Sequence, residues 1–331
     1  MNSKVRNFLG SPWGQRATIL VIVCVVMAIF EPNFFKLSNF SSILLAISIY
    51  GIMACGMLFT VLVGGMDLSM GSVAALGGTI LATYTVKYNY GNQALPIAIV
   101  LVLIVCIAIG LLHGVLVTKV GIPAFVVTLA TQYLVLGIVM VYTNNSYTYL
   151  TERTGATYIF GNARILGIQM PTFIFIAVAA VCVFILGFTT FGRRLYAVGG
   201  NMKAANYLGI KSDRMVIIAF VVSSVSAGLG GMLLGSMNMC AGSGTASGYE
   251  GDVLMAMIVG GINLAGGEGG VAGAIYGALF VGIINNVQIL LGVPSDYQDF
   301  IKGVIIILAL ALNIYTQRRA AGLTGSKKKA Q

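Results

Sequence analysis

The chain has 331 residues, of which 58% are hydrophobic and 8% are charged, and it carries a net charge of +10. Soluble globular domains are about half apolar and about a quarter charged, so this composition excludes an ordinary soluble protein and predicts one embedded in a bilayer. The basic residues lie mostly between and beside apolar runs, which indicates membrane topology rather than nucleic-acid binding.

Apolar runs follow one another along the whole chain. A helix needs roughly 20 apolar residues to cross the hydrocarbon core of a bilayer. By this rule the sequence predicts an all-α polytopic membrane protein with about ten transmembrane helices in a single domain, residues 1–331. The spans are expected near 15–33, 40–63, 68–86, 94–117, 122–143, 171–189, 215–239, 251–265, 269–291 and 298–316.

The distribution of basic residues predicts the orientation. If the N-terminus lies inside, most of the 19 Lys and Arg residues fall on interior segments, as the positive-inside rule requires. Both termini and the segment around 190–214 are then expected to be cytoplasmic. The segment 144–170 becomes the longest exterior loop, where a soluble delivery partner or simply the membrane interface is expected to meet the protein.

Two glycine-broken segments resemble each other within the sequence. Residues 63–71 and 259–267 share five of nine positions, and Asp67 in the first corresponds to Asn263 in the second. Broken helices in corresponding parts of a membrane protein mark transport sites, because unwound backbone at membrane depth needs a cavity or protein around it. The predicted topology makes them parallel repeats. Chance similarity in a chain with 43 glycines is the alternative.

Polar side chains inside or beside apolar runs are the candidates for a translocation pathway. They are Asp67, Ser69, Gln132, Asn285 and Asn286. Neutral amides both donate and accept hydrogen bonds, which suits an uncharged, hydroxyl-rich solute, but they also join helices to one another. For Asp67 the alternative is a helix cap that accepts backbone N–H bonds.

Small residues recur at helical spacing in two predicted spans. Ser223, Ala227, Gly231 and Gly235 follow this pattern in one span, and Gly269, Gly273 and Gly277 follow it in the other. Such stripes let helices approach closely. They predict tight packing within one bundle, with a subunit interface as the alternative.

Catalytic and metal-binding patterns are missing. The five cysteines are scattered without a CxxC pair, so neither a metal nor a redox site is expected. The single histidine, His113, has no acidic neighbour in the sequence and is expected to be structural. A GxxxxGK[ST] loop is absent, so the chain is not expected to hydrolyse ATP or to bind a cofactor itself.

The polar stretch 192–214 is the longest interior segment between the apolar runs and predicts a cytoplasmic docking surface. Its sequence KAANYLG, residues 203–209, resembles the E-A-A-x-x-x-G loop of ABC importer permeases, although Met202 or Lys203 stands where that family has glutamate. Small alanines permit close approach, and Gly209 permits the turn. The docking candidates are Arg193, Arg194, Lys203, Ala204, Ala205, Asn206, Tyr207, Leu208 and Gly209.

Further motifs extend this resemblance over most of the chain. GGMDLSMGS at 64–72, IPAFVVTLA at 122–130, GRRLYAVGGN at 192–201 and the glycine-rich stretch 260–286 are similar to ribose-type sugar permeases of ABC importers. LLGVPSDYQDFIKG at 290–303 is similar to the same family. Two positions depart from it: Leu136 stands where the family usually has Arg, and His113 where it usually has Asn.

The resemblance implies a multi-pass permease in a bacterial inner membrane. A second permease copy, identical or related, would pair with it; cytoplasmic ATPase subunits would carry MgATP; and an extracytoplasmic binding protein would deliver a monosaccharide or related polyol. A permease for nucleosides or branched-chain amino acids remains an alternative within the wider family. Alternatives from other classes are a stand-alone ion-coupled transporter and a structural scaffold.

Overall fold

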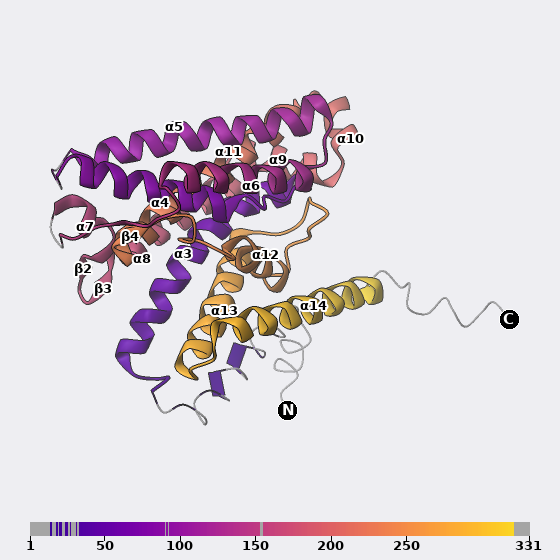
Figure 1. Cartoon of the computed structure of the whole chain (residues 1–331). Helices are drawn as coiled ribbons and strands as arrows, with labels where there is room; N and C mark the ends of the chain where they lie inside the picture. The colour runs from indigo at the N-terminus through magenta and orange to yellow at the C-terminus, as the bar shows by residue number, and fades with distance from the viewer. Residues whose placement is uncertain are drawn as a thin grey trace.

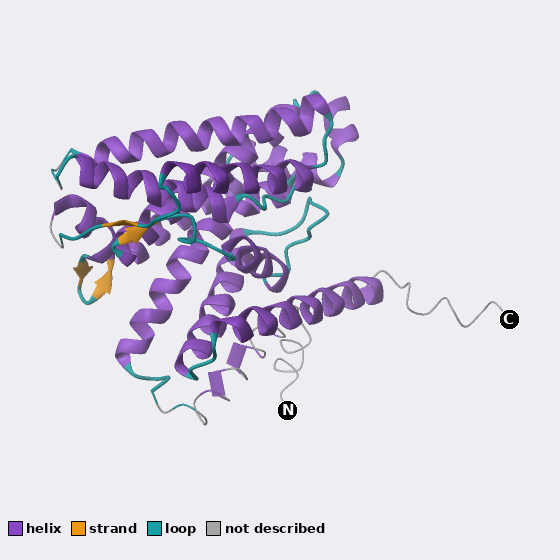
Figure 2. Cartoon of the chain, viewed as in Figure 1, coloured by secondary structure: helices purple, strands orange, loops and turns teal. Residues whose placement is uncertain are grey.

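The computed structural model describes residues 33–89, 91, 93–152 and 155–320, together with isolated positions between residues 14 and 31. Within this part of the chain lie twelve α-helices, α3 to α14, one π-helical turn and four strands of two residues each. The all-helical prediction is confirmed. The short strands only tie loops together near one end of the molecule (Figure 2).

Six of the described helices are long and apolar enough to cross a membrane. They are α3 (Leu37–Leu62), α5 (Ala94–Val115) with its π-helical extension η1 (Leu116–Val120), α6 (Ala124–Tyr142), α8 (Met170–Phe188), α11 (Ser212–Asn238) and α13 (Val271–Leu290). Each of these helices matches a predicted span to within a few residues. Apolar length was therefore sufficient to locate them.

Other predicted spans have a different outcome. α4 (Met70–Lys87) and α14 (Ser295–Ala320) are helices where spans 68–86 and 298–316 were predicted, but neither is among the six. The predicted span 15–33 falls largely outside the described residues. A total of ten spans and the cytoplasmic position of both termini stay predictions.

The predicted span 251–265 is wrong. The helix there, α12 (Tyr249–Val259), has 11 residues, which at 1.5 Å per residue is roughly 16 Å, about half the hydrocarbon thickness. Glycines end it: Gly261, Gly266 and Gly267 all have positive φ, at 67°, 97° and 76°, a conformation that glycine adopts without steric cost. Residues 260–270 therefore form a loop rather than the second half of a helix.

Helix α11 lies at the centre of the bundle and packs against α3, α4 and α5. Glycines allow this packing. A methyl group at Gly231 would overlap the backbone of Ala74, and Gly235 lies against Gly78 of α4. The small-residue stripe of α11 therefore packs within the bundle, as predicted.

The same holds for the second stripe. Gly273 and Gly277 of α13 meet the backbone of Gly260 and of Ala256, at and just before the end of α12, so α12 and α13 pack closely. Gly269, the first member of this stripe, lies in the loop before α13. This stripe too serves packing inside one chain.

The loops gather at two opposite ends of the helices (Figure 1). At one end lie α7 (Gly155–Asn162) and the hairpin of β2 (Arg164–Ile165) and β3 (Ile168–Gln169). There β1 (Thr148–Tyr149) also pairs antiparallel with β4 (Cys240–Ala241). At the other end lie α9 (Thr190–Gly200) and α10 (Met202–Tyr207). The loops 144–170 and 190–214 are thus on opposite sides of the bundle, as predicted.

Candidate functional site

The segment 190–214 consists of two capped helices and the start of α11. Thr189 caps α9 by accepting the Gly192 N–H through Oγ1 at 3.3 Å, and Asn201 caps α10 by accepting the Ala204 N–H through Oδ1 at 3.0 Å. Gly209 ends the second helix with a φ of 79°. Such caps satisfy N–H groups that have no partner within the helix, so the polar sequence folds into a defined surface.

Most of the predicted docking residues lie on the outside of this segment. Tyr207 is 92% exposed and Leu208 is 80% exposed. Arg193, Arg194, Lys203, Ala204, Asn206 and Gly209 are exposed as well. Ala205 is the exception, because it is 2% exposed and packs inward. Eight of the nine docking candidates are therefore exposed, whereas Ala205 fixes α10 to the bundle; the docking role of these residues stays a prediction.

The inner side of α9 meets two other segments through backbone atoms. Gly267 donates its N–H to the Leu62 carbonyl oxygen at 2.9 Å. A methyl group at Gly199 would overlap both the Leu62 oxygen and the Gly267 nitrogen. The end of α3, the end of α9 and the loop 260–270 therefore touch at one point, which we call the glycine junction (Leu62, Gly199 and Gly267).

A side chain of α9 adds a second attachment to the same loop. Tyr196 donates its hydroxyl to the Gly269 carbonyl oxygen at 2.9 Å. Burial raises the pKa of the Tyr196 hydroxyl above its usual value, so the group stays protonated and remains a donor at neutral pH. The loop that follows α12 is thus held to α9 at two places.

The two segments that resemble each other in sequence also fold alike and touch. Asp67 Oδ1 accepts the Ser69 N–H at 3.0 Å, and Asn263 Oδ1 accepts the Ala265 N–H at 3.0 Å. Both are turns in which the side chain bonds the backbone two residues on. Gly64 and Gly266 approach so closely that a methyl group on Gly266 would lie 2.8 Å from the Gly64 nitrogen. The shared turn supports the predicted repeat over chance similarity.

Asp67 is fully buried and fully bonded. Its Oδ1 also accepts the Ser69 hydroxyl at 2.6 Å, and its Oδ2 accepts the Ser223 hydroxyl of α11 at 2.7 Å. The cap prediction needs a correction, since Ser69 is the N-cap residue of α4 and its own side chain makes no capping hydrogen bond. Asp67 accepts a backbone N–H, as predicted, but in the turn before the helix, and it ties this turn to α11.

His113 is buried beside the same region. Its ring packs edge-on against Phe220 of α11, with the ring centres 5.8 Å apart. Neither ring nitrogen has a hydrogen-bond partner among the described residues. This packing supports the structural role predicted for His113.

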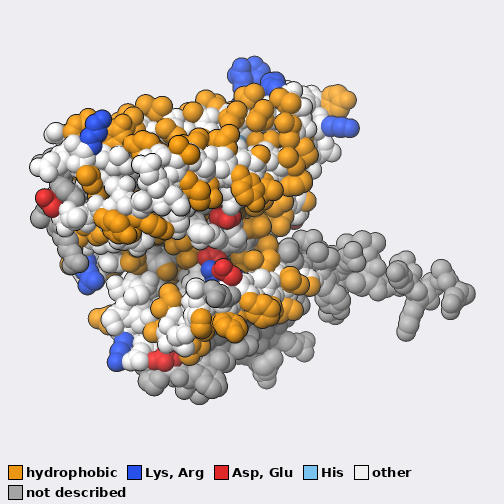
Figure 3. Space-filling model, viewed as in Figure 1, with side chains coloured by type: hydrophobic (Ala, Val, Ile, Leu, Met, Phe, Trp, Pro, Cys, Tyr) orange, Lys and Arg blue, Asp and Glu red, His pale blue; other side chains and the backbone are white. Residues whose placement is uncertain are grey.

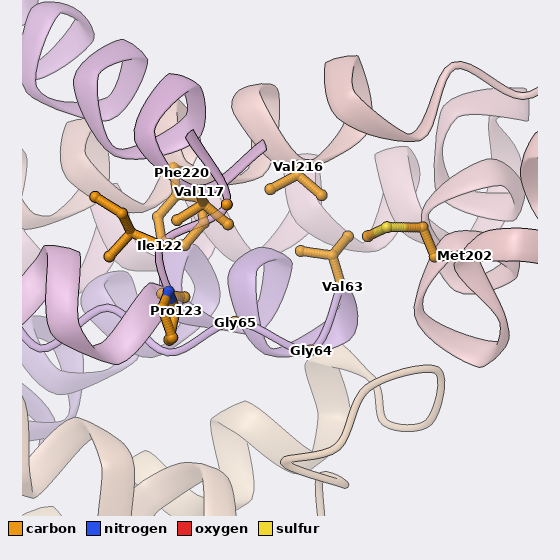
Figure 4. Close-up of a pocket in the computed structure, with 11 residues that line it drawn as sticks. Val63, Gly64, Gly65, Val117, Ile122, Pro123, Met202, Val216 and Phe220 are labelled. Carbon is orange, nitrogen blue, oxygen red and sulfur yellow. The ribbon is translucent and has the colours of Figure 1, made fainter. Parts of the chain in front are cut away.

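A cavity of about 290 Å³ begins at Val63, the residue that follows Leu62 of the glycine junction (Figure 4). One wall is the broken segment after α3, with Val63, Gly64 and Gly65, and Met202 of α10 lies at one side. The turn 121–124 and α11 complete a largely apolar lining. Open space therefore separates the start of α10 from the turn between η1 and α6.

The amide candidates fall into three different surroundings. Gln132 of α6 donates to Glu250 of α12 at 2.9 Å. Asn286 exchanges hydrogen bonds with Asn39 of α3, at 2.7 and 3.0 Å. The structure does not bring these side chains together with Asp67 and Ser69 into one site.

Asn285 belongs to a polar cluster that the sequence did not reveal. Its Nδ2 donates to the Tyr50 hydroxyl at 2.7 Å and to Asp252 Oδ2 at 3.1 Å. Lys302 of α14 pairs with the same Asp252 oxygen at 3.1 Å. Lys302, a basic residue within an apolar run, was the signal available in the sequence, because charges at membrane depth mark functional sites. We call Tyr50, Tyr249, Asp252, Asn285 and Lys302 the α12 cluster.

Apolar crossing helices, a repeated pair of broken segments and a capped polar loop on one side together define a membrane transport subunit. The family model described as "Branched-chain amino acid transport system / permease component" matches residues 39–310, and the chain belongs to this family. It is the permease component of an ABC import system, a multi-pass inner-membrane protein whose ATPase is a separate subunit.

Curated relatives match nearly the whole chain. The ribose import permease protein RbsC of Haemophilus influenzae is 36% identical over 91% of this chain and 93% of its own length. RbsC of Escherichia coli K12 is 36% identical over 93% of this chain and 96% of its own length. The L-arabinose transport system permease protein AraH of the same strain is 32% identical over 93% of each. No solved structure matches the chain.

Proposed function

We propose that this chain passes a monosaccharide such as ribose or arabinose, or a related polyol, across the membrane. The observation that carries this solute class is the similarity to ribose and arabinose permeases at 32–36% identity. A second permease copy, identical or related, completes the pore, and a binding protein delivers the sugar from outside. Nucleosides and branched-chain amino acids are the rival solutes.

The cytoplasmic ATPase subunits, which carry MgATP, dock on α9 and α10. Tyr207 and Leu208 support this assignment, because two large apolar side chains exposed on a polar loop supply the anchors that dominate protein interfaces. Arg193, Arg194 and Lys203 add exposed positive charge on the same two helices. Since the family glutamate is replaced here, the apolar anchors carry more of the contact.

Motion of the ATPases reaches the pathway through the glycine junction. A displacement of α9 presses on the end of α3 and on the loop 260–270, since all three meet through backbone atoms that cannot rotate aside. The cavity beside Met202 gives α10 room to shift. The loop 260–270 leads directly to α12 and α13, so these helices rock with it.

Asp67 and Ser69 hold the other broken segment in place. Both are fully buried, and their hydrogen bonds are internal to the turn or reach α11. They position the turn that follows α3 against α11 while the glycine junction moves. Asn286 joins α13 to α3 through Asn39, which leaves Gln132 and Asn285 as the pathway candidates.

The exterior hairpin of β2 and β3 is the contact for the binding protein. Leu166 at its tip is 96% exposed and Ile165 is 46% exposed. Two exposed aliphatic side chains on a short turn suit a transient protein contact. They lie at the end of the bundle opposite the ATPase surface (Figure 1).

Reconstitution tests the function. The permease, its ATPase and its binding protein are placed in proteoliposomes, and uptake of labelled ribose, arabinose, leucine and uridine is followed with and without ATP. We expect ATP-dependent uptake of a sugar and none of leucine or uridine. Gradient-driven uptake without the ATPase would contradict the proposal, as would uptake of leucine or uridine alone.

Docking has its own test. Leu208→Asp should lower affinity for the ATPase at least about tenfold, because truncating a hot spot costs about 2 kcal/mol or more. Ile159→Asp, the same kind of change at a 52% exposed position of α7 at the opposite end of the bundle, is the control. Unchanged co-purification of the ATPase with Leu208→Asp would exclude docking at this position.

A further inference from the structure

The α12 cluster places a charged pair at membrane depth. Tyr50, one of its members, lies near the middle of α3, so the cluster is far from both ends of the bundle. The side chains of Lys302 and Asp252 are 18% and 4% exposed. Ionisable groups at this depth are costly and belong to pathways or to paired networks.

Amide and aromatic groups accompany the charges. The rings of Tyr50 and Tyr249 stack with their centres 4.8 Å apart. Asn285 is 8% exposed, and its Oδ1 has no hydrogen-bond partner among the described residues. A buried polar atom without a partner calls for an explanation, and an absent ligand that donates a hydrogen bond supplies one.

The face of the protein beside the cluster is hollowed and carries charge. Figure 3 shows acidic and basic side chains gathered in a hollow in the middle of this face, between the bundle that contains α6 and the helix α14. Gln132 and Glu250, bonded to each other and half-buried, bridge α6 to α12. Asp299 at the start of α14 is 87% exposed. Lipid chains do not solvate such groups, so water or protein covers this face.

We infer that the α12 cluster, with the neighbouring Gln132–Glu250 pair, binds the transported solute, and that this solute is a neutral, hydroxyl-rich molecule. The inference rests on the proposed function and names its site. Each hydrogen-bonded pair in the cluster joins a donor to an acceptor. A hydroxyl group of the solute can therefore insert between the two groups and bond to both. The stacked tyrosines offer an apolar surface for the C–H side of a sugar ring.

Thiol labelling tests whether this face is open to water. The five native cysteines are first replaced, Gln132→Cys is introduced, and the whole transporter in proteoliposomes is treated with a membrane-impermeant methanethiosulfonate. Tyr133→Cys is the control, because Tyr133 is 70% exposed and, as the next residue of α6, points about 100° away from Gln132 around the helix. We expect labelling at position 132 and none at 133.

Solute protection tests what the face binds. At a sugar concentration of about twice its Kd, mass action leaves a third of the sites free, so labelling at 132 should slow about threefold. Ribose or arabinose should give this protection and leucine should not. Absence of labelling at 132, equal labelling at both positions, or protection by leucine alone would overturn the inference.

Two neighbouring asparagines separate solute binding from packing. Asn285→Leu should raise the KM for ATP-driven sugar uptake about tenfold, the upper range for one lost hydrogen bond, with folded protein still recovered. Asn286→Leu removes the pair with Asn39 and should lower thermal stability while the KM stays unchanged. An unchanged KM in Asn285→Leu, while the wild-type transporter takes up sugar, would refute the site and leave the proposed function standing.

Discussion

The short helix α12 meets the rest of the molecule in different ways at its two ends. In its first turn, side chains meet side chains: Asp252 bonds Asn285 and Lys302, and Glu250 bonds Gln132. Beyond its last residue, backbone meets backbone at the glycine junction. Side-chain pairs can exchange partners with a solute, whereas packed backbone transmits displacement. One end of α12 is therefore suited to binding and the other to coupling.

The largest effect on sugar uptake is expected from Gly199→Ala. The added methyl overlaps the backbone atoms of Leu62 and Gly267, and backbone cannot turn away as a side chain can. Overpacking costs about 1–3 kcal/mol, and the upper half of this range applies here because the overlap is with two backbone atoms, so sugar uptake should fall at least about tenfold. Gly200→Ala is the matched control, since nothing lies within 4 Å of the added methyl. Equal uptake by the two variants would show that the junction does not couple.

At the other end of α12 the expected effect is on stability rather than on uptake. Lys302→Met leaves the buried Asp252 carboxylate without its cation, and breaking a buried pair costs about 3 kcal/mol or more. Thermal unfolding of the permease in nanodiscs should therefore shift to lower temperature. Adding Asp252→Asn to the same chain should recover most of the loss, because no unpaired charge remains. If Lys302→Met alone is as stable as the wild type, water already solvates the Asp252 carboxylate.

A smaller effect is expected from Tyr196→Phe. This change removes the hydrogen bond to Gly269 and keeps the ring, at a cost of about 1 kcal/mol. Uptake should fall about fivefold with ATPase binding unchanged, because the docking surface is intact. Tyr142→Phe, an exposed change on α6, serves as the control. If the two variants take up sugar equally, the Tyr196 hydrogen bond does not contribute to coupling, which then depends on the glycine junction alone.

The smallest effect is expected from Asp67→Asn. An amide keeps the turn through its oxygen and can donate to Ser223, whose hydroxyl then accepts instead of donating. Uptake should stay within about twofold of the wild type, and Asp67→Ala should fall below it because it loses all three bonds. Near-complete loss in a folded Asp67→Asn protein would mean that the negative charge itself is needed in the pathway.

Local patterns in the sequence predicted much of this arrangement. Apolar length placed six helices long enough to cross a membrane, and the resemblance between 63–71 and 259–267 predicted a repeat, which the two matching turns support. The prediction from apolar length was wrong for α12, because the apolar run 251–265 gives no sign that Gly261 and Gly266 have positive φ. A hydropathy pattern carries no backbone dihedral angles, so the run was interpreted as a full span.

Contacts between distant residues could not be predicted. Tyr50 and Asn285 bond across 235 positions, and Lys302 and Asp252 across 50. Neither pair has a local signature, because their meeting depends on how α3, α12, α13 and α14 pack. The glycine junction is similar: three segments meet there only after the helices are assembled.

The most direct test of the account is the number of sugar molecules taken up per ATP hydrolysed, measured on the same proteoliposomes for wild type, Gly199→Ala and Gly200→Ala. If the junction links the ATPases to α12, Gly199→Ala should keep hydrolysing ATP while its ratio falls at least about tenfold, and Gly200→Ala should keep the wild-type ratio. A ratio that is the same in all three proteins, with uptake and hydrolysis falling together, would contradict the account.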